Sequence, residues 1–177
     1  GRASARETVN WVAAGAVAKK ILKNEGVSVF GFVSEIGKIK AEKFDYENLK
    51  NKYFFCDESK LPQLDSMFDD LIKEGNSVGA KLRIIVKNCP VGLGDPVFEK
   101  LDANLAKAIM TINAVKSVSV GNTDDLLELK GSEVRDEMTS SGYSSNNSGG
   151  ILGGISNGDD INLNFIIKPT SSIQTKG

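Results

Sequence analysis

Two segments in the C-terminal part of the sequence have residue types that suit the binding of an anion or a cofactor. Residues 142–158 read GYSSNNSGGILGGISNG and hold six glycines among serine and asparagine. Glycine has no Cβ atom, so backbone amides in such a stretch can approach a planar or anionic ligand closely. A second set follows soon after and combines one cation, a rigid proline and three hydroxyl groups, which suits a phosphate or the polar edge of a cofactor: Lys168, Pro169, Thr170, Ser171 and Ser172.

Each of these segments also has a purely structural interpretation. Composition alone does not separate a flexible linker from a binding loop in the glycine-rich stretch. The Ile151–Leu152 pair between two Gly-Gly pairs favours a fixed loop, because flexible linkers rarely hold buried-type residues at their centre. The spacing does not match the GxGxxG pattern of dinucleotide-binding folds. Residues 168–172 are equally compatible with a hydroxyl-rich turn at the end of a strand.

A third candidate site lies at the start of the sequence. Ser4 and Glu7 have the spacing of a capping box and predict that a helix begins there. Arg2 and Arg6 surround this cap, where the helix N-terminus carries positive partial charge, so they could bind an anion. The alternative is a solvated first turn. Asn113 and Ala114, between a predicted helix and a predicted strand, have no meaning without further context.

The composition excludes several classes of function for these 177 residues. There is no histidine, so histidine-based acid, base, triad or metal chemistry is absent. With Lys+Arg 22 against Asp+Glu 23, no bulk positive field gathers nucleic acid or an anionic membrane. Cys56 and Cys89 lie far apart without CxxC spacing, which favours free thiols in a reducing compartment. No apolar run approaches the roughly 20 residues of a membrane span, and we expect a cytoplasmic protein.

The elements that must position these residues can be read from periodicity. Helical spacing of apolar residues predicts helices over 9–21, 61–72 and 97–112. The first is expected to end at Gly26 and the second near Gly75. Asp95 and Pro96 are expected at the start of the third. Alternation predicts strands over 27–33, 80–86, 115–120 and 161–167. Residues 38–60 are expected to form a surface excursion with short structure near 44–49, and 124–137 stay ambiguous. We predict an α+β fold in one domain over 1–177, with a layered α/β domain as the alternative.

Four segments in order resemble consecutive motifs of the chorismate synthase family. They are GRASARETVNWVAAGAVAKK, NCPVGLGDPVFEKLDANLAKAIMTINAVK, NNSGGILGGISNG and KPTSSI, and they extend from residue 1 to residue 173. The resemblance implies a β-α-β sandwich, a homotetramer and a lyase of the shikimate pathway, which leads to the aromatic amino acids. It also implies conversion of 5-enolpyruvylshikimate-3-phosphate to chorismate and phosphate by anti elimination, with reduced FMN (FMNH2) as cofactor. NADP is associated with the family, and the sequence does not show whether the enzyme reduces its own flavin.

The resemblance assigns roles to particular positions. Arg6 would bind the anionic substrate. The flavin-contacting positions would be Arg2, Ala3, Ser4, Asn113, Ala114, Gly153, Lys168, Pro169, Thr170, Ser171 and Ser172. The family usually has serine where this chain has Ala3, which removes a hydroxyl. The glycine-aromatic element after INAVK is replaced by Gly121-Asn122-Thr123-Asp124, so this loop is expected to differ locally.

The family's histidine motifs have no counterpart in this sequence. Because those motifs supply proton donors, we expect the chain to be the central part of the enzyme, with no catalytic residue of its own and no activity alone. One alternative is a non-catalytic flavin- or phosphate-binding module that kept the loops and lost the chemistry. Another is a structural domain with a glycine linker. No metal, nucleic acid or membrane partner is expected. If the source is a plant or an alga, the expected location is the plastid instead of the cytoplasm.

Overall fold

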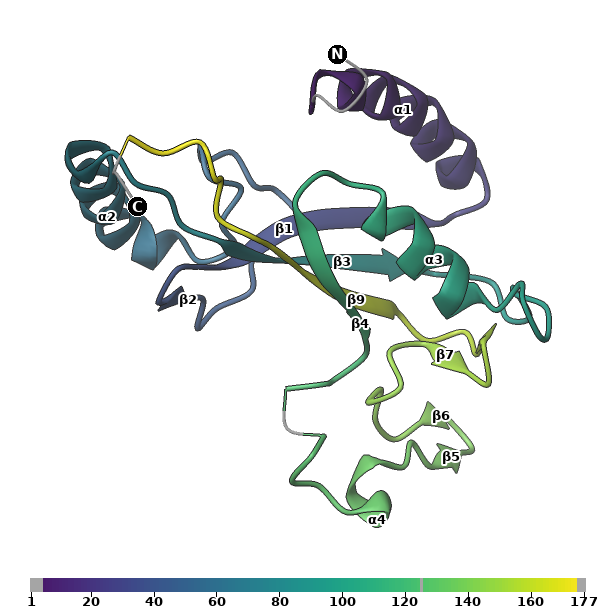
Figure 1. Cartoon of the computed structure of the whole chain (residues 1–177). Coiled ribbons are helices and arrows are strands. Elements are labelled where there is room, and N and C mark those ends of the chain that lie inside the picture. The colour runs from purple at the N-terminus through teal and green to yellow at the C-terminus, as the bar shows by residue number, and fades with distance from the viewer. Residues whose placement is uncertain (1–4, 125, 175–177) are drawn as a thin grey trace.

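The main element of the computed structural model, which describes residues 5–124 and 126–174, is a five-stranded sheet (Figure 1). Its strand order is β2-β1-β3-β9-β4. The strands are β1 (Ser28–Ile36), β2 (Ile39–Lys40), β3 (Ala80–Lys87), β4 (Val115–Val120) and β9 (Ile161–Ile167). Every neighbouring pair is antiparallel. The predicted α+β class is therefore confirmed, and the layered α/β alternative, which needs parallel strands, is wrong.

The sheet has one apolar face and one polar face. On β9, Ile161, Leu163 and Phe165 are 2%, 2% and 6% exposed, and they pair with Val86, Ile84 and Leu82 on β3. Helix α3 (Leu101–Met110) packs on this face and closes the core there. The alternate residues of the same strands point to the opposite face. The alternation predicted for 80–86 and 161–167 is thus confirmed, and its physical basis is burial of one side only.

Helix α2 (Leu61–Glu74) was also predicted correctly, including its end. Gly75 has φ 64°, in the left-handed region that glycine adopts without strain, and its N–H donates to the carbonyl of Ile72. Leu64 on this helix is fully buried against Phe55 and Ile36 in a second apolar cluster. The excursion over 38–60 packs on this cluster and contains the two-residue strand β2 and the short 3-10 helix η2 (Glu58–Lys60) as regular structure.

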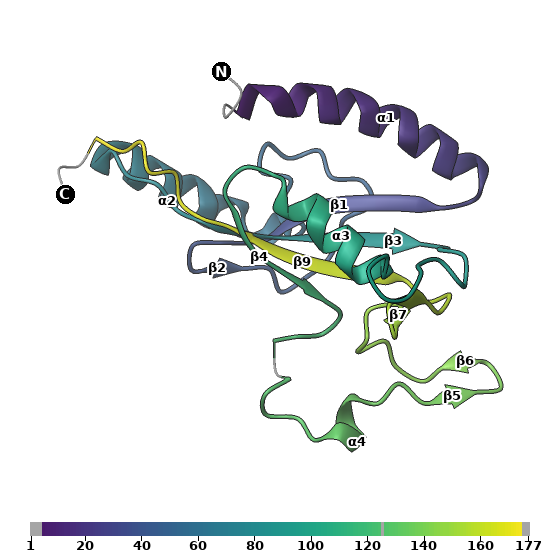
Figure 2. The same cartoon turned by 45° about the vertical axis from the view of Figure 1, so that its right-hand side comes forward.

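Helix α1 (Thr8–Asn24) follows the short 3-10 helix η1 (Ala5–Glu7) and ends before Gly26, as the glycine stop predicts. The predicted capping serine, Ser4, lies outside the described residues. Thr8 Oγ1 donates to the carbonyl of Ala5 at 2.7 Å. No residue of α1 is buried within the described part of the chain, and both views show the helix standing away from the sheet (Figures 1 and 2).

The predicted start of the third helix is wrong. The structure begins α3 at Leu101, and Asp95 and Pro96 belong to a preceding turn in which the Asp95 N–H donates to the Glu99 carbonyl at 2.9 Å. The first N–H of the helix, that of Leu101, donates to the carbonyl of Gly154 at 2.8 Å. The first N–H of the helix thus finds its acceptor in a segment more than fifty residues away, and this bond takes the place of a local cap.

The ambiguous and glycine-rich stretches form small elements that project from one end of the sheet (Figure 2). They are α4 (Gly131–Val134), β5 (Met138–Thr139), β6 (Gly142–Tyr143), β7 (Ile151–Leu152) and β8 (Ile155–Ser156). Cys56 and Cys89 are buried free thiols, as predicted. Across the described ranges, no helix has the length and apolar character that crossing a membrane requires.

Asp57 organises the excursion over 38–60 although its side chain is only 2% exposed. Its carboxylate accepts hydrogen bonds from the backbone N–H groups of Glu42 at 2.9 Å and Lys43 at 3.1 Å, and from the N–H and hydroxyl of Ser59. The Ser59 hydroxyl bond and these backbone bonds outweigh burial and lower the pKa of Asp57 to about 2. The carboxylate is therefore ionised at neutral pH.

Replacing Asp57 by alanine is expected to lower the free energy of unfolding by about 2–3 kcal/mol, the scale of hydrogen bonds to a buried charge. Because the folded-state pKa is depressed, this contribution is present above the ordinary pKa of 3.8 and is lost as the pH falls toward 2. Urea denaturation at several pH values measures both effects. Asp45→Ala is the matched control, because the Asp45 carboxylate is exposed; equal losses in the two variants would contradict this role.

Candidate cofactor-binding site

The end of β9 brings together two segments that the sequence marked as candidates. The backbone N–H of Lys168 donates to the carbonyl of Ala114 at 2.9 Å, which continues the pairing of β9 with β4. Ala114 and its neighbour Asn113 form the turn that links α3 to β4. Ala114 has φ 68°, a conformation that residues with a Cβ atom adopt only at a cost. We call Asn113, Ala114 and Lys168 the β9-end junction.

Residues 168–174 continue from this junction along the end of α2. The Ser77 hydroxyl donates to the carbonyl of Thr170 at 2.7 Å, and the Gln174 N–H donates to the carbonyl of Gly75 at 2.9 Å. Lys168 Nζ donates to Ser171 Oγ at 3.1 Å. Pro169, Thr170, Ser171 and Ser172 are all exposed. The turn is thus held by its backbone while its hydroxyl groups and the lysine face outward, where a polar ligand can reach them.

The side chain of Asn113 gives the clearest sign of a missing partner. Its Oδ1 atom is buried and accepts no hydrogen bond within the described residues. A buried polar atom without a partner costs about 1–3 kcal/mol, and folded proteins contain few of them. An N–H or O–H donor on a bound molecule would remove that cost, so the junction suits a polar cofactor edge.

Arg6 lies in η1, directly before α1, and its side chain is exposed. Arg2, Ala3 and Ser4 lie outside the described residues. In both views the start of α1 points toward the end of the sheet where the α3–β4 turn and the end of β9 are found (Figures 1 and 2). The N-terminus of α1 therefore presents positive partial charge on the same side of the molecule as the β9-end junction.

Gly153 is not brought to this junction within one chain. It lies in the turn between β7 and β8, which precedes the opposite end of β9, about 20 Å away at the rise of an extended strand. Gly153 has φ 61°, and an added Cβ would meet no atom within 4 Å. A single site that used both Gly153 and Lys168 would need an elongated ligand or the hairpin of a second copy.

The glycine-rich stretch is a fixed loop, which decides between its two sequence-based interpretations. Ile151 is only 6% exposed and belongs to the main core. A Cβ on Gly149 would lie 2.4 Å from the backbone nitrogen of Gly121, and a Cβ on Gly150 would lie 2.7 Å from the carbonyl oxygen of Asp160. Gly149 and Gly150 serve close backbone packing, whereas Gly142 and Gly153 face open space.

Asp136 fastens this loop, and sequence reasoning missed it because 124–137 show no periodicity. Its carboxylate accepts hydrogen bonds from Ser145 Oγ at 2.6 Å, from the Asn147 N–H at 2.8 Å and from the N–H and hydroxyl of Ser148. Burial raises the pKa of Asp136, but these bonds outweigh it and lower the pKa to about 2. The only signal in the sequence is an acidic residue a few positions before a serine- and asparagine-rich run.

Comparison with known proteins gives one consistent result. The family model described as chorismate synthase matches residues 1–177. A crystal structure of chorismate synthase superposes with a TM-score of 0.84 at 32% sequence identity, over 95% of this chain and 57% of the other. The chain thus spans little more than half the length of that solved structure.

Two glycines of the loop allow a matched test of its packing. Gly149 and Gly153 both have positive φ, so alanine at either position carries the left-handed strain of about 1–2 kcal/mol. Only at Gly149 must the backbone also move to admit a Cβ. We expect Gly149→Ala to lower the free energy of unfolding by at least about 3 kcal/mol and Gly153→Ala by about 1 kcal/mol, measured by urea denaturation. Similar losses would show that the loop is not packed as described.

Proposed function

Because this chain belongs to the chorismate synthase family, we propose that it is the central part of a lyase that converts 5-enolpyruvylshikimate-3-phosphate to chorismate and phosphate. We call that longer protein the parent enzyme. The proposed reaction is an anti elimination that depends on reduced FMN and forms the last common step of the shikimate pathway. The observation that carries the proposal is the β9-end junction, where a backbone hydrogen bond from Lys168 to Ala114 joins residues of two family motifs. The neighbouring Asn113 has a buried Oδ1 atom that finds no partner among the described residues.

The residues of the junction fit a flavin. Asn113 Oδ1 can accept from an N–H group, Lys168 supplies a cation, and the hydroxyls of residues 170–172 supply exposed donors. The strained backbone of Ala114 directs the turn that presents Asn113. Reduced FMN would supply an electron transiently to the substrate as phosphate leaves. The chain's own contribution is to bind the flavin, orient it and cover one side of it.

Asn113→Leu tests this assignment, because the change removes the oxygen at nearly constant size. Without flavin, the free energy of unfolding should stay the same or rise, since an unsatisfied buried acceptor is lost. The affinity for FMN should fall about tenfold, equal to about 1.4 kcal/mol. Fluorescence titration of the parent enzyme with FMN measures the affinity.

Asn104→Leu, at an exposed position on α3, is the control for that substitution and should leave FMN binding unchanged. If Asn113→Leu instead lowers stability and leaves the FMN affinity intact, the oxygen has a structural role and the cofactor assignment fails.

We further propose that Arg6 binds the negative charge of the substrate. Its place in the turn before α1 puts a guanidinium where the helix already favours anions. Arg6→Ala in the parent enzyme should lower kcat/KM by the equivalent of roughly 1.5–3 kcal/mol, the range of a charged hydrogen bond. The FMN affinity should change much less. Loss of flavin binding with an unchanged KM for substrate would show that Arg6 binds the cofactor rather than the substrate.

We propose that the parent enzyme is a homotetramer of the cytoplasm, or of the plastid in a plant or alga. The exposed α1 supports assembly: Val12 and Val17 are 71% and 60% exposed, although the spacing of its apolar residues is that of a packed face. Packing against other parts of the parent enzyme or against further subunits would bury this face. NADP, as the source of electrons for the flavin, is part of the same proposal.

These 177 residues alone are expected to form no chorismate from substrate and reduced FMN under anaerobic conditions, whereas the parent enzyme turns over. The chain has no histidine, and burial raises the pKa of Cys56 to about 11, so this thiol does not exchange protons readily at neutral pH. Burial also raises the pKa of Cys89. Turnover by the isolated chain, above a buffer blank and free of host enzyme, would show that the histidine motifs are not needed.

A further inference from the structure

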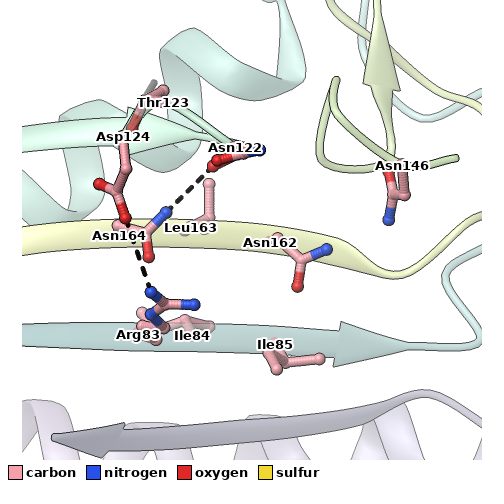
Figure 3. Close-up of a pocket in the computed structure, with 11 residues that line it drawn as sticks. Arg83, Ile84, Ile85, Asn122, Thr123, Asp124, Asn146, Asn162, Leu163 and Asn164 are labelled. Atoms are coloured by element: carbon pink, nitrogen blue, oxygen red, sulfur yellow. Dashed lines mark hydrogen bonds and ion pairs between the residues drawn. The ribbon is translucent and has the colours of Figure 1, made fainter. Parts of the chain in front are cut away.

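A polar pocket of about 240 Å³ lies on the face of the sheet opposite α3 (Figure 3). Strands β3 and β9 form its floor, and the loop over 121–124 and Asn146 form its walls. Its charged and amide side chains are Arg83, Asp124, Asn122, Asn146, Asn162 and Asn164. None of the residues proposed for flavin or substrate binding lines this pocket. We call it the asparagine pocket.

Arg83 supplies the charged hydrogen-bond donors of the pocket. Its guanidinium lies over the ring of Phe44, 4.7 Å from the centroid, which holds the group in place. Its Nε atom is buried and has no partner within the described residues. The nearest acid, Asp124, is 3.9 Å away, beyond hydrogen-bond distance, and is already bound by Lys81 Nζ at 2.7 Å. Arg83 therefore keeps donors available for a ligand.

Asn162 and Asn164 supply acceptors. The amino group of Asn164 donates to the carbonyl of Gly121 at 3.1 Å, and that of Asn162 donates to the carbonyl of Asp160 at 3.3 Å. A carbonyl accepts only from the amino half of an amide, so these bonds fix both side-chain orientations. The two Oδ1 atoms are left without a hydrogen bond to any described residue, and Figure 3 shows both turned toward β3.

The charges of the pocket are balanced, which selects the class of ligand. An anion would be attracted by Arg83 and repelled by Asp124 and the amide oxygens. A simple cation would be repelled by Arg83 and attracted by Asp124 and these oxygens. A small molecule with both charges satisfies both sets of groups. The volume equals that of roughly eight water molecules, which suits the smaller amino acids.

We propose that the asparagine pocket binds a small α-amino acid, with its carboxylate on Arg83 and its ammonium group on the Oδ1 atoms of Asn162 and Asn164. The carboxylate gains the planar fork of the guanidinium. The ammonium group gains two fixed acceptors and the nearby carboxylate of Asp124. The wall over 121–124 is also where the sequence departs from the family's glycine-aromatic pattern.

Calorimetric titration of the parent enzyme tests the class of ligand. L-Alanine and L-serine should each bind saturably, with one site per chain. Acetate carries the carboxylate alone and methylamine the ammonium group alone, so each should bind at least tenfold more weakly than L-alanine. Absence of saturable binding by both amino acids overturns the proposal. Acetate binding as tightly as L-alanine also overturns it, because the site would then be a plain oxyanion site.

Two variants locate the site. Arg83→Gln and Asn162→Leu should each weaken L-alanine binding at least tenfold, and thermal denaturation confirms that each variant is folded. Asn162→Leu keeps the test decisive if Arg83→Gln fails to fold. Lys87→Gln is the matched control: it removes a positive charge from the same strand and face, where Lys87 pairs with Glu47 at 2.6 Å outside the pocket, and it should leave binding unchanged. Equal loss in the control and the pocket variants would overturn the proposal.

The proposal is independent of the proposed reaction, and a titration with FMN present separates the two. L-Alanine should bind with the same affinity whether or not FMN is bound, because the pocket and the β9-end junction share no residue. Competition between L-alanine and FMN would place the amino acid in the flavin site and overturn a separate pocket.

Discussion

The pairing of β9 with both β3 and β4 is the constraint on which the rest of the structure depends. β9 pairs antiparallel with both neighbours, so the alternation of apolar and polar residues along this seven-residue strand determines which face of the sheet is apolar and which is polar. Ile161, Leu163 and Phe165 build the apolar face, and Asn162 and Asn164 line the polar pocket. The two ends of β9 connect to the glycine-rich hairpin and to the β9-end junction. A shift of β9 by one residue in register would place its apolar side chains on the polar face and its polar side chains on the apolar face. Both the core and the pocket would then be lost.

Two carboxylates, the buried Asp57 and the partly buried Asp136, hold the segments that have little regular structure. Asp57 and Asp136 each accept hydrogen bonds from two or more backbone N–H groups and from serine hydroxyls. Burial alone would raise both pKa values, yet both fall to about 2, so the hydrogen bonds outweigh desolvation. One acid orders the excursion over 38–60, and the other orders the loop that leads to Gly153.

Features that depend on local periodicity could be predicted from the sequence. The alternation of 80–86 and 161–167 predicted two central strands, and the glycine stop predicted the end of α2. The Ile151–Leu152 pair correctly favoured a fixed loop, since Ile151 is buried in the main core. In each case the signal and the force that it reports lie within one segment.

Features that depend on contacts between distant segments could not be predicted from the sequence. The start of α3 is set by the carbonyl of Gly154, so the local Asp95-Pro96 signal was overruled. Nothing in the order of residues shows that Ala114 adopts a left-handed conformation or that Asn113 Oδ1 finds no partner among residues 5–124 and 126–174. The motif resemblance marked these two positions, and the geometry supplies a physical reason for them.

The central claim is that the β9-end junction holds the cofactor, and hydrogen–deuterium exchange of the parent enzyme tests it most directly. Adding FMN should slow exchange at residues 113–115 and 168–172, because the ligand covers these amides and reduces local opening. Exchange at Met138–Thr139 and Gly142–Tyr143, far from the junction, should stay unchanged. Protection by FMN that leaves residues 113–115 and 168–172 unaffected would contradict the account.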